Sequence, residues 1–241
     1  MERYRSAFGM PDVSSYPSVN YPTVCGRLAL IYAEWCEWEF AVEFANYALQ
    51  ARDDPTAQKA MIQAATESQN ETAIHAVKNM RVSDKTSLLY IDLLIAQGDD
   101  DEALATLESL EISETTSEFG TSPLSWVHLT NRFLLIAMHK GNTAAFDDRL
   151  NVAWNRYFTS DEDFDTFRQK IRSGAGNNMQ WSLTLAARYM SIIAYQKFRD
   201  DGNSKEATRW RERARLLAEA IVAANPMFDL HYKRVIMPKL K

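Results

Sequence analysis

Two stretches of the chain, GDDDEALATL starting at Gly98 and GNSKEATRWR starting at Gly202, share one order of residues. Each begins with glycine, continues with three polar residues and reaches a Glu-Ala pair, whose alanines are Ala103 and Ala207. The chain of 241 residues has only eight glycines, so the recurrence indicates a repeated structural unit. A glycine that ends one helix just before polar residues that begin the next is typical of a tight turn. The pattern therefore predicts a helical hairpin that occurs more than once.

Helical periodicity extends from these stretches over nearly the whole chain. Apolar residues recur at intervals of three and four, and no alternating runs separated by Asn-Gly or Asp-Gly turns indicate strands. We therefore predict an all-α fold, with helices at 23–36, 39–52, 56–68, 71–81, 85–97, 100–110, 124–140, 143–158, 161–173, 178–200 and 204–225. Short connections between these helices should make neighbouring helices antiparallel.

The alanine that follows the turn is a mark on which the predicted hairpins can be aligned. The marks are Ala41, Ala73, Ala103, Ala145 and, after a longer interval, Ala207. Seven residues later come Ala48, Met80, Leu110, Val152 and Ala214. Because residues seven apart lie on one face of a helix, a small residue and a later apolar one allow the second helix to lie close to the first. The alignment predicts a series of closely packed hairpins.

This pattern resembles the tetratricopeptide repeat, whose consensus has an apolar-small pair and an aromatic on its first helix, glycine at the turn, and alanines seven apart on its second. The residues that carry the resemblance are Leu28, Ala29, Tyr32, Ala41, Ala48 and Leu49 in the first pair, Gly98, Ala103 and Leu110 in the third, and Gly202, Ala207 and Ala214 in the last. The consensus tryptophan is missing, and the pair at 124–158 is degenerate. The resemblance implies antiparallel hairpins stacked as a right-handed superhelix, an α-solenoid.

Composition divides the chain into five segments. We expect an extended N-terminal segment at 1–22, rich in Tyr, Ser and Pro, for which a disordered tail is an equal alternative. TPR-like hairpins follow at 23–110, and a polar loop or joint at 111–123. Further hairpins with longer helices occupy 124–225, and a basic C-terminal tail occupies 226–241.

Charge and hydropathy narrow the class of protein. The 27 basic and 32 acidic side chains leave a net charge of −5, which is ordinary for a globular domain. No apolar run approaches the ~20 residues that cross a bilayer, and MERYRSAFGM lacks the apolar stretch of a secretory signal, so we expect a cytoplasmic protein without a membrane span. The two cysteines, Cys25 and Cys36, suit neither a disulfide framework nor a zinc site.

The sequence contains no recognisable catalytic constellation. Phosphate-binding glycine loops, nucleophile elbows and paired-histidine zinc motifs are missing, and the four histidines are widely spaced. The acidic run SDEDFD at 160–165 lacks the glycine and the closing glutamate of a calcium loop, so Ser160 and its acidic neighbours are better explained as a helix start. We expect no enzymatic activity, no metal and no cofactor, with an all-helical enzyme of unrecognised site as an alternative.

The resemblance implies a function and a set of binding residues. We expect a non-enzymatic protein-interaction module, a scaffold, adaptor or chaperone-like protein, that binds a partner segment in its concave groove. The partner is another protein or peptide, and the chain's own N-terminal segment or a second copy is a further candidate. The groove positions implied are Leu30, Ala33, Ile62, Ala65, Leu88, Asp92, Ile95, Leu134 and Ala137, for each of which core packing is the alternative.

An arginine-rich stretch provides the main rival function. Arg209, Arg211, Arg213 and Arg215 surround Trp210 in RWRERAR, and such a set can contact phosphates or an anionic surface. Alternate residues on a helix point about 200° apart, however, and Glu206 and Glu212 stand at pairing distance along it. A solvated, salt-bridged face is the interpretation we favour, and nucleic acid is disfavoured as a partner.

Overall fold

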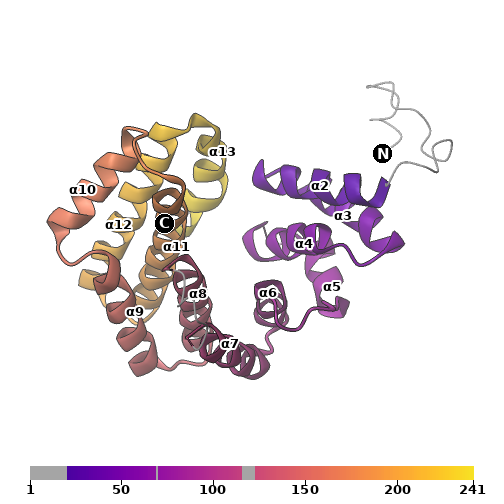
Figure 1. Cartoon of the computed structure of the whole chain (residues 1–241), viewed down its shortest axis with the longest axis horizontal. Coiled ribbons are helices and arrows are strands. Elements are labelled where there is room, and N and C mark those ends of the chain that lie inside the picture. The colour runs from indigo at the N-terminus through magenta and orange to yellow at the C-terminus, as the bar shows by residue number, and fades with distance from the viewer. Residues whose placement is uncertain (1–20, 69, 116–122) are drawn as a thin grey trace. The chain divides into compact units, whose positions relative to one another are not determined.

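The computed structural model describes residues 21–68, 70–115 and 123–241, and the side chains within these ranges except those of 111–115 and 123–126. The described residues form helices joined by turns and contain no strand (Figure 1). The chain divides into two compact units at Ser83 and Asp84. The predicted N-terminal segment falls outside the described residues, apart from Tyr21 and Pro22, which begin the first described helix.

The first unit is built from four helices: α2 (Tyr21–Glu34), α3 (Trp38–Ala51), α4 (Pro55–Ser68) and α5 (Glu71–Asn79). Helix α2 packs against α3 and α4, α3 packs against α4, and α4 packs against α5. Alanine dominates the buried positions, which include Ala29, Ala33, Ala41, Ala45, Ala48, Ala57, Ala60 and Ala64, each without exposed surface. Since alanine adds so little volume, the helix backbones approach one another closely.

One contact between α2 and α4 depends on a glycine. Gly26 is buried on α2, and a Cβ atom at this position would lie 2.6 Å from the Oδ1 atom of Asp54. That oxygen accepts hydrogen bonds from the backbone N–H groups of Thr56 and Ala57, at 3.0 and 3.1 Å, and so caps the start of α4. The absence of a side chain on Gly26 leaves the space that the capping carboxylate fills.

The second unit begins with α6 (Leu88–Gln97), α7 (Asp100–Thr115), α8 (Pro123–His139), α9 (Thr143–Tyr157), α10 (Asp161–Arg172), α11 (Asn178–Asp200) and α12 (Ser204–Ala224). It ends with the short helices η2 (Pro226–Phe228), α13 (Asp229–His231), the π-helix η3 (Tyr232–Ile236) and α14 (Met237–Lys239). Helices α11 and α12 form an antiparallel pair, with α8 against α11 and α10 against α12. Aromatic rings fill this core: Trp154 contacts Phe158, Phe164 and Trp210 with ring centroids 4.7, 5.5 and 4.9 Å away.

One turn geometry recurs between paired helices, as the repeated glycine predicted. Gly98, Gly141 and Gly202 have φ angles of 84°, 66° and 74°, a left-handed conformation that glycine adopts without steric cost. In each case the glycine N–H donates to the carbonyl three residues back, and the next N–H donates to the carbonyl five residues back. Cys36 makes the same two bonds between α2 and α3 with a φ of 57°. Gly174, after α10, also makes the same two bonds with a φ of 73°, so the predicted turn is confirmed and occurs at five places.

The shared turn corrects the alignment of one hairpin. Ala145 and Val152 were predicted to face the partner helix of their pair, but Val152 is 52% exposed. The buried positions are Phe146 and Ala153, each with no exposed surface. Phe146 follows Gly141 by five residues, the same interval that separates the other turn glycines from their alanines. The turn glycine, and not the nearest alanine, therefore sets the register.

The observed helix boundaries lie within three residues of the predicted ones except at the end of α7, which continues to Thr115 through part of the expected joint. The division between the two compact units lies at Ser83 and Asp84, ahead of that joint. The segment expected as a basic tail folds into the short helices after α12. It buries Val235, Ile236 and Leu240, so apolar side chains hold it against the unit.

Candidate functional site

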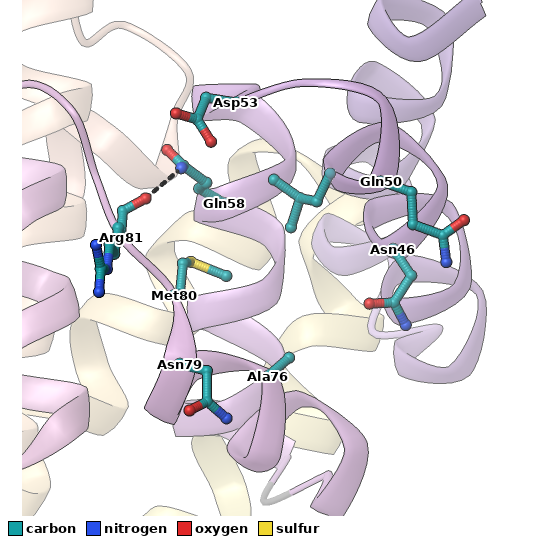
Figure 2. Close-up of a pocket in the computed structure, with 9 residues that line it drawn as sticks. Asn46, Gln50, Asp53, Gln58, Ala76, Asn79, Met80 and Arg81 are labelled. Carbon is teal, nitrogen blue, oxygen red and sulfur yellow. Dashed lines mark hydrogen bonds between the residues drawn. The ribbon is translucent and has the colours of Figure 1, made fainter.

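A hollow with a mixed polar and apolar lining lies in the first unit, where the ends of α3 and α5 meet the start of α4 (Figure 2). Its volume is about 410 Å³. The residues that line it are Asn46, Leu49, Gln50, Asp53, Gln58, Ala76, Asn79, Met80 and Arg81. Figure 2 shows Asn46 and Gln50 on one side, across from Gln58, Asn79 and Met80 on the other.

Four carboxamide side chains supply most of the polar groups that line the hollow. Gln58 is 2% exposed, and its Nε2 atom donates a hydrogen bond of 2.8 Å to the carbonyl oxygen of Arg81. This bond orients the buried amide and ties the segment after α5 to α4. The other three amides, Asn46, Gln50 and Asn79, are half-buried or exposed and so are accessible to a ligand.

An amide-lined hollow suits one kind of ligand particularly well. Each carboxamide offers two donors and an acceptor, and the backbone of an extended peptide presents one donor and one acceptor per residue. Leu49 and Met80 provide apolar surface between the amides, while Asp53 and Arg81 are exposed charges of opposite sign. The arrangement can hold a peptide backbone by hydrogen bonds and receive an apolar side chain.

The sequence alone did not single out this hollow, because the resemblance places the binding surface on the first helix of each pair. Asn46 and Gln50 lie on α3, the second helix of its pair, and Asn79 lies at the end of α5. The sequence feature that could have indicated the hollow is the spacing of Asn46 and Gln50, which are one helical turn apart beside the buried Ala45 and Ala48. Such spacing marks an accessible polar edge on an otherwise buried helix.

The predicted groove residues divide into buried and partly exposed positions. Ala33, Ile62, Leu134 and Ala137 are buried, with at most 6% exposure, so these four belong to the core and not to an open groove. The physical reason is that their helix faces pack against neighbouring helices. Partly exposed positions are Leu30 and Ala65 in the first unit and Leu88, Asp92 and Ile95 in the second. Asp92 accepts a hydrogen bond of 2.6 Å from Nη2 of Arg132, which offsets its charge.

The large apolar side chains that are exposed in the first unit lie elsewhere. Among its described residues they are Val24 and Ile31 on α2, Trp35 directly after α2, and Tyr47 on α3, with exposed fractions of 37–49%. None of them belongs to the predicted groove set. Residues 1–20, which belong to the N-terminal segment expected as a candidate occupant of the predicted groove, lie outside the described residues.

Arg213 is not on a solvated face as predicted. Its side chain is 8% exposed, and the guanidinium carbon lies 4.3 and 4.7 Å from the ring centroids of Trp154 and Trp210. Nη2 donates a hydrogen bond of 3.1 Å to Asp161. Burial lowers the pKa of the Arg213 guanidinium, while the bond to Asp161 acts in the opposite direction. Arg213 therefore joins α9, α10 and α12 in the core of the second unit.

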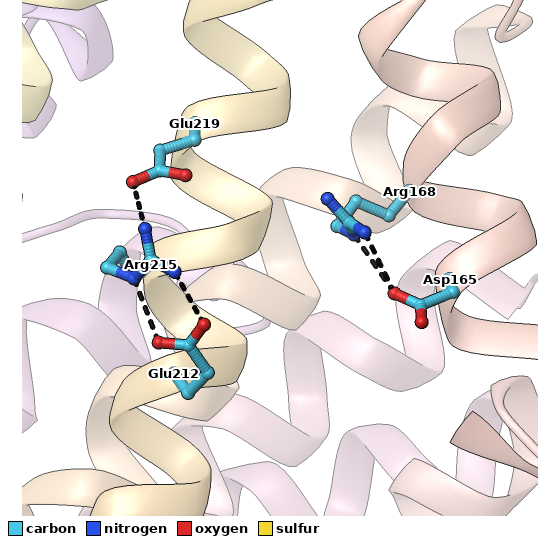
Figure 3. A network of polar contacts seen from close by, with 5 residues as sticks. All are labelled: Asp165, Arg168, Glu212, Arg215 and Glu219. Carbon is cyan, nitrogen blue, oxygen red and sulfur yellow. Dashed lines mark hydrogen bonds and ion pairs between the residues drawn. The ribbon is translucent and has the colours of Figure 1, made fainter. Parts of the chain in front are cut away.

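The other arginines of this helix are on the surface. Arg215 pairs with Glu212 and Glu219, each with a closest distance of 2.5 Å, and Figure 3 shows the three side chains together. These bonds raise the pKa of Arg215 and lower that of Glu212. Arg209 pairs with Glu206 at 3.5 Å, whereas Arg211 is exposed and has no ion pair within the described part of the chain.

An acidic turn in the second unit forms another hollow. It is lined by Gly98, Asp99, Asp100, Asp101, Glu102 and Lys140. Lys140 pairs with Asp101, and Nδ1 of His139 lies 3.2 Å from Asp100. These contacts tie the start of α7 to the end of α8. Over the described ranges, no group of three or more His, Cys, Asp or Glu residues could hold a metal ion.

Two further findings concern the rest of the described chain. Cys25 and Cys36 are buried and form no disulfide with each other, and burial raises the pKa of the Cys25 thiol. Of the helices that the structure describes, none combines the length and hydropathy needed to cross a membrane.

Comparisons with known proteins found no relative of this chain. No protein-family model, no curated protein and no solved structure matches the chain. The basis for a function is therefore the chemistry and geometry of its own residues.

Proposed function

We propose that this protein is a non-enzymatic interaction module that binds an extended peptide segment of a partner protein in the amide-lined hollow of its first unit. The observation that carries this proposal is the convergence of four carboxamides, Asn46, Gln50, Gln58 and Asn79, from three helices on one hollow of about 410 Å³. A volume of this size is within the range of small-ligand sites.

The hydrogen-bonding capacity of the hollow favours peptide binding over catalysis. Asparagine and glutamine donate and accept hydrogen bonds without taking up or releasing protons, so they recognise a peptide backbone but do not act as acids or bases. The buried Gln58 is held by its bond to the Arg81 carbonyl, which reduces the ordering cost of binding.

We further propose that the hairpins are degenerate repeats of the TPR-like class, stacked as in an α-solenoid. Two observations support this. The same left-handed turn follows five helices, α2, α6, α8, α10 and α11. Small residues seven apart, Ala41 with Ala48 and Ala207 with Ala214, are buried on the second helices. In such stacks each hairpin buries the apolar face of its neighbour.

The rival function, binding of nucleic acid or an anionic surface, has weaker support. A phosphate-binding surface needs cations that are accessible and free of competing carboxylates. Arg213 is buried, while Arg209 and Arg215 are paired with glutamates. Of the four arginines in this part of α12, Arg211 is the one that is exposed and forms no ion pair with a described carboxylate.

The test is selection of peptides from a random phage-displayed library against the full chain, followed by calorimetric titration of the selected synthetic peptides. Replacing Asn46 and Gln50 together by alanine should weaken binding about tenfold or more, because hydrogen bonds to the peptide backbone are lost. Asn79→Ala should weaken it in the same direction. Asn151→Ala, an exposed asparagine in the second unit, is the matched control and should leave affinity unchanged. Equal affinity of the peptides for all these variants would refute the proposed site.

A further inference from the structure

A second candidate surface lies on the segment after α12, which we call the C-terminal face. It consists of the exposed side chains of Met227, Leu230, Lys233, Arg234, Met237 and Lys241. Met227 is 75% exposed, Met237 43% and Leu230 37%, and exposed apolar side chains that gather on one side of a segment are typical of an interaction site. These residues recur at intervals of three and four, so they follow one side of a nearly continuous helical segment.

The C-terminal face rests on a packed base. Val235 and Ile236 are each 2% exposed and Leu240 is 6% exposed, so they anchor the opposite side of the segment. Phe228 contacts Trp181 of α11, with ring centroids 5.7 Å apart and the rings in edge-to-face geometry. Met179, at the start of α11, is 51% exposed. The exposed residues are therefore presented by an ordered segment.

The segment contains one turn of π-helix, η3, a geometry that is found frequently at functional sites. The consecutive residues Val235 and Ile236, both buried, lie in this wider turn. Met237, the next residue, is exposed again. The π-helical turn therefore contributes to both sides of the segment: Lys233 and Arg234 are exposed, and Val235 and Ile236 are buried.

The charge of the C-terminal face differs from that of the chain. The segment 226–241 carries Lys233, Arg234, Lys239 and Lys241 against one acid, Asp229, in a protein whose net charge is −5. Lys233 pairs with Asp229 at 2.6 Å, but both side chains are largely exposed, and such a surface pair contributes little. Its ammonium can therefore exchange Asp229 for a carboxylate of a partner at small cost.

We propose that the C-terminal face binds an acidic amphipathic helix of a partner protein. Met227, Leu230 and Met237 would contact apolar residues repeated at helical spacing, and Lys233, Arg234 and Lys241 would meet flanking glutamates or aspartates. Methionine favours this partner because its flexible, polarisable side chain adapts to differently shaped apolar surfaces. From Met227 to Met237 the segment rises by about 15 Å, which matches about three turns of a docked helix.

Two other partners fit the same residues less well. A nucleic acid would use the cations but would leave the exposed methionines and leucine without a partner. Elements that lie on membranes expose Trp, Phe and Leu on a broad apolar side. Here Phe228 and Tyr232 are half-buried, and the side chains with the most exposed apolar area are methionines.

The experiment measures fluorescence anisotropy of a labelled peptide of about 16 residues titrated with the full chain. The peptide has leucines at i, i+3, i+7 and i+10 and glutamates beside them, and its twin has lysines in place of the glutamates. The first variant of the protein carries Met227→Ser, Leu230→Ser and Met237→Ser, with Val152→Ser on α9 as the matched exposed apolar control. The second carries Lys233→Glu and Lys241→Glu, with Lys205→Glu as the charge control.

The parent and both controls should bind the acidic peptide. The serine variant should lose about tenfold or more in affinity, and the charge-reversed variant should lose the acidic peptide and gain its lysine twin. This exchange keeps the test decisive even if the serine variant is less stable. Three results would overturn the proposal: no binding of the acidic peptide, unchanged affinity in both variants, or binding of single-stranded RNA or anionic phosphatidylserine vesicles that depends on the lysines but not on the methionines. The proposal concerns the second unit and does not rest on the hollow of the first.

Discussion

Replacing Gly26 by alanine should destabilise the first unit, although alanine is the better helix former. The added Cβ atom would lie 2.6 Å from Oδ1 and 2.9 Å from Cγ of Asp54. The Asp54 side chain is 6% exposed, and its oxygens are bonded to Thr56, Ala57 and Arg52. The carboxylate therefore cannot move aside without giving up the cap of α4.

Opposing contributions set the size of this effect. Removing a glycine from a helix interior gains about 1 kcal/mol. Losing an N-cap costs about 1 kcal/mol and up to about 2, and leaving a buried polar group without its partners costs about 1 kcal/mol more. We expect Gly26→Ala to lower the free energy of unfolding by about 1–2 kcal/mol.

A double-mutant cycle with Asp54→Ala tests this reasoning. When Asp54 is alanine the obstructing carboxylate is gone, so Gly26→Ala should then stabilise the protein by about 1 kcal/mol, and the coupling between the two sites should be about 2–3 kcal/mol. Urea unfolding followed by circular dichroism measures the four proteins, and hydrogen exchange of the α2 and α4 amides assigns the change to the first unit. If Gly26→Ala stabilises both backgrounds equally, the predicted contact between Gly26 and Asp54 does not exist.

Three further predictions test the second unit. Gly98→Ala and Gly202→Ala should each lower the free energy of unfolding by about 1 kcal/mol, because both glycines have positive φ angles. Nothing lies within 4 Å of an added Cβ, so the cost comes from the backbone conformation alone. An unchanged melting temperature would contradict the turn geometry. Arg213→Gln should destabilise by about 2 kcal/mol through loss of its contacts with two tryptophans and an aspartate, whereas Arg211→Gln should stay within about 0.5 kcal/mol of the parent; equal urea midpoints would argue against the buried position. Burial raises the pKa of Asp147 above its ordinary 3.8, so the stability that its protonated form provides at lower pH is lost as the pH rises through the raised pKa. Asp147→Asn should therefore be more stable than the parent near neutral pH. Unfolding measured across this pH range would show no such gain if the carboxyl is well solvated.

The sequence by itself determined the local features of this protein. Helix positions followed from apolar periodicity, and their starts followed from capping residues such as Ser160 and Asn203, whose side chains accept the expected backbone hydrogen bonds. The repeated turn at Gly98 and Gly202 could be predicted because few residues other than glycine adopt its left-handed conformation. These features depend on residues within one or two turns of each other, so a single sequence contains the information needed.

Only the tertiary structure decided which side chains are buried and which remain available. Arg213 resembles its arginine neighbours in sequence, but it lies between two tryptophans because α9 and α12 pack together there. The sequence pattern placed Leu134 in a groove, but in the structure this side chain is fully buried against other helices. Gln58 is held in the lining of the hollow by a hydrogen bond to a carbonyl 23 residues away. The C-terminal face could not be foreseen either, since composition alone suggested a tail. Burial depends on which helix faces meet, and that is set by packing between residues far apart in the chain.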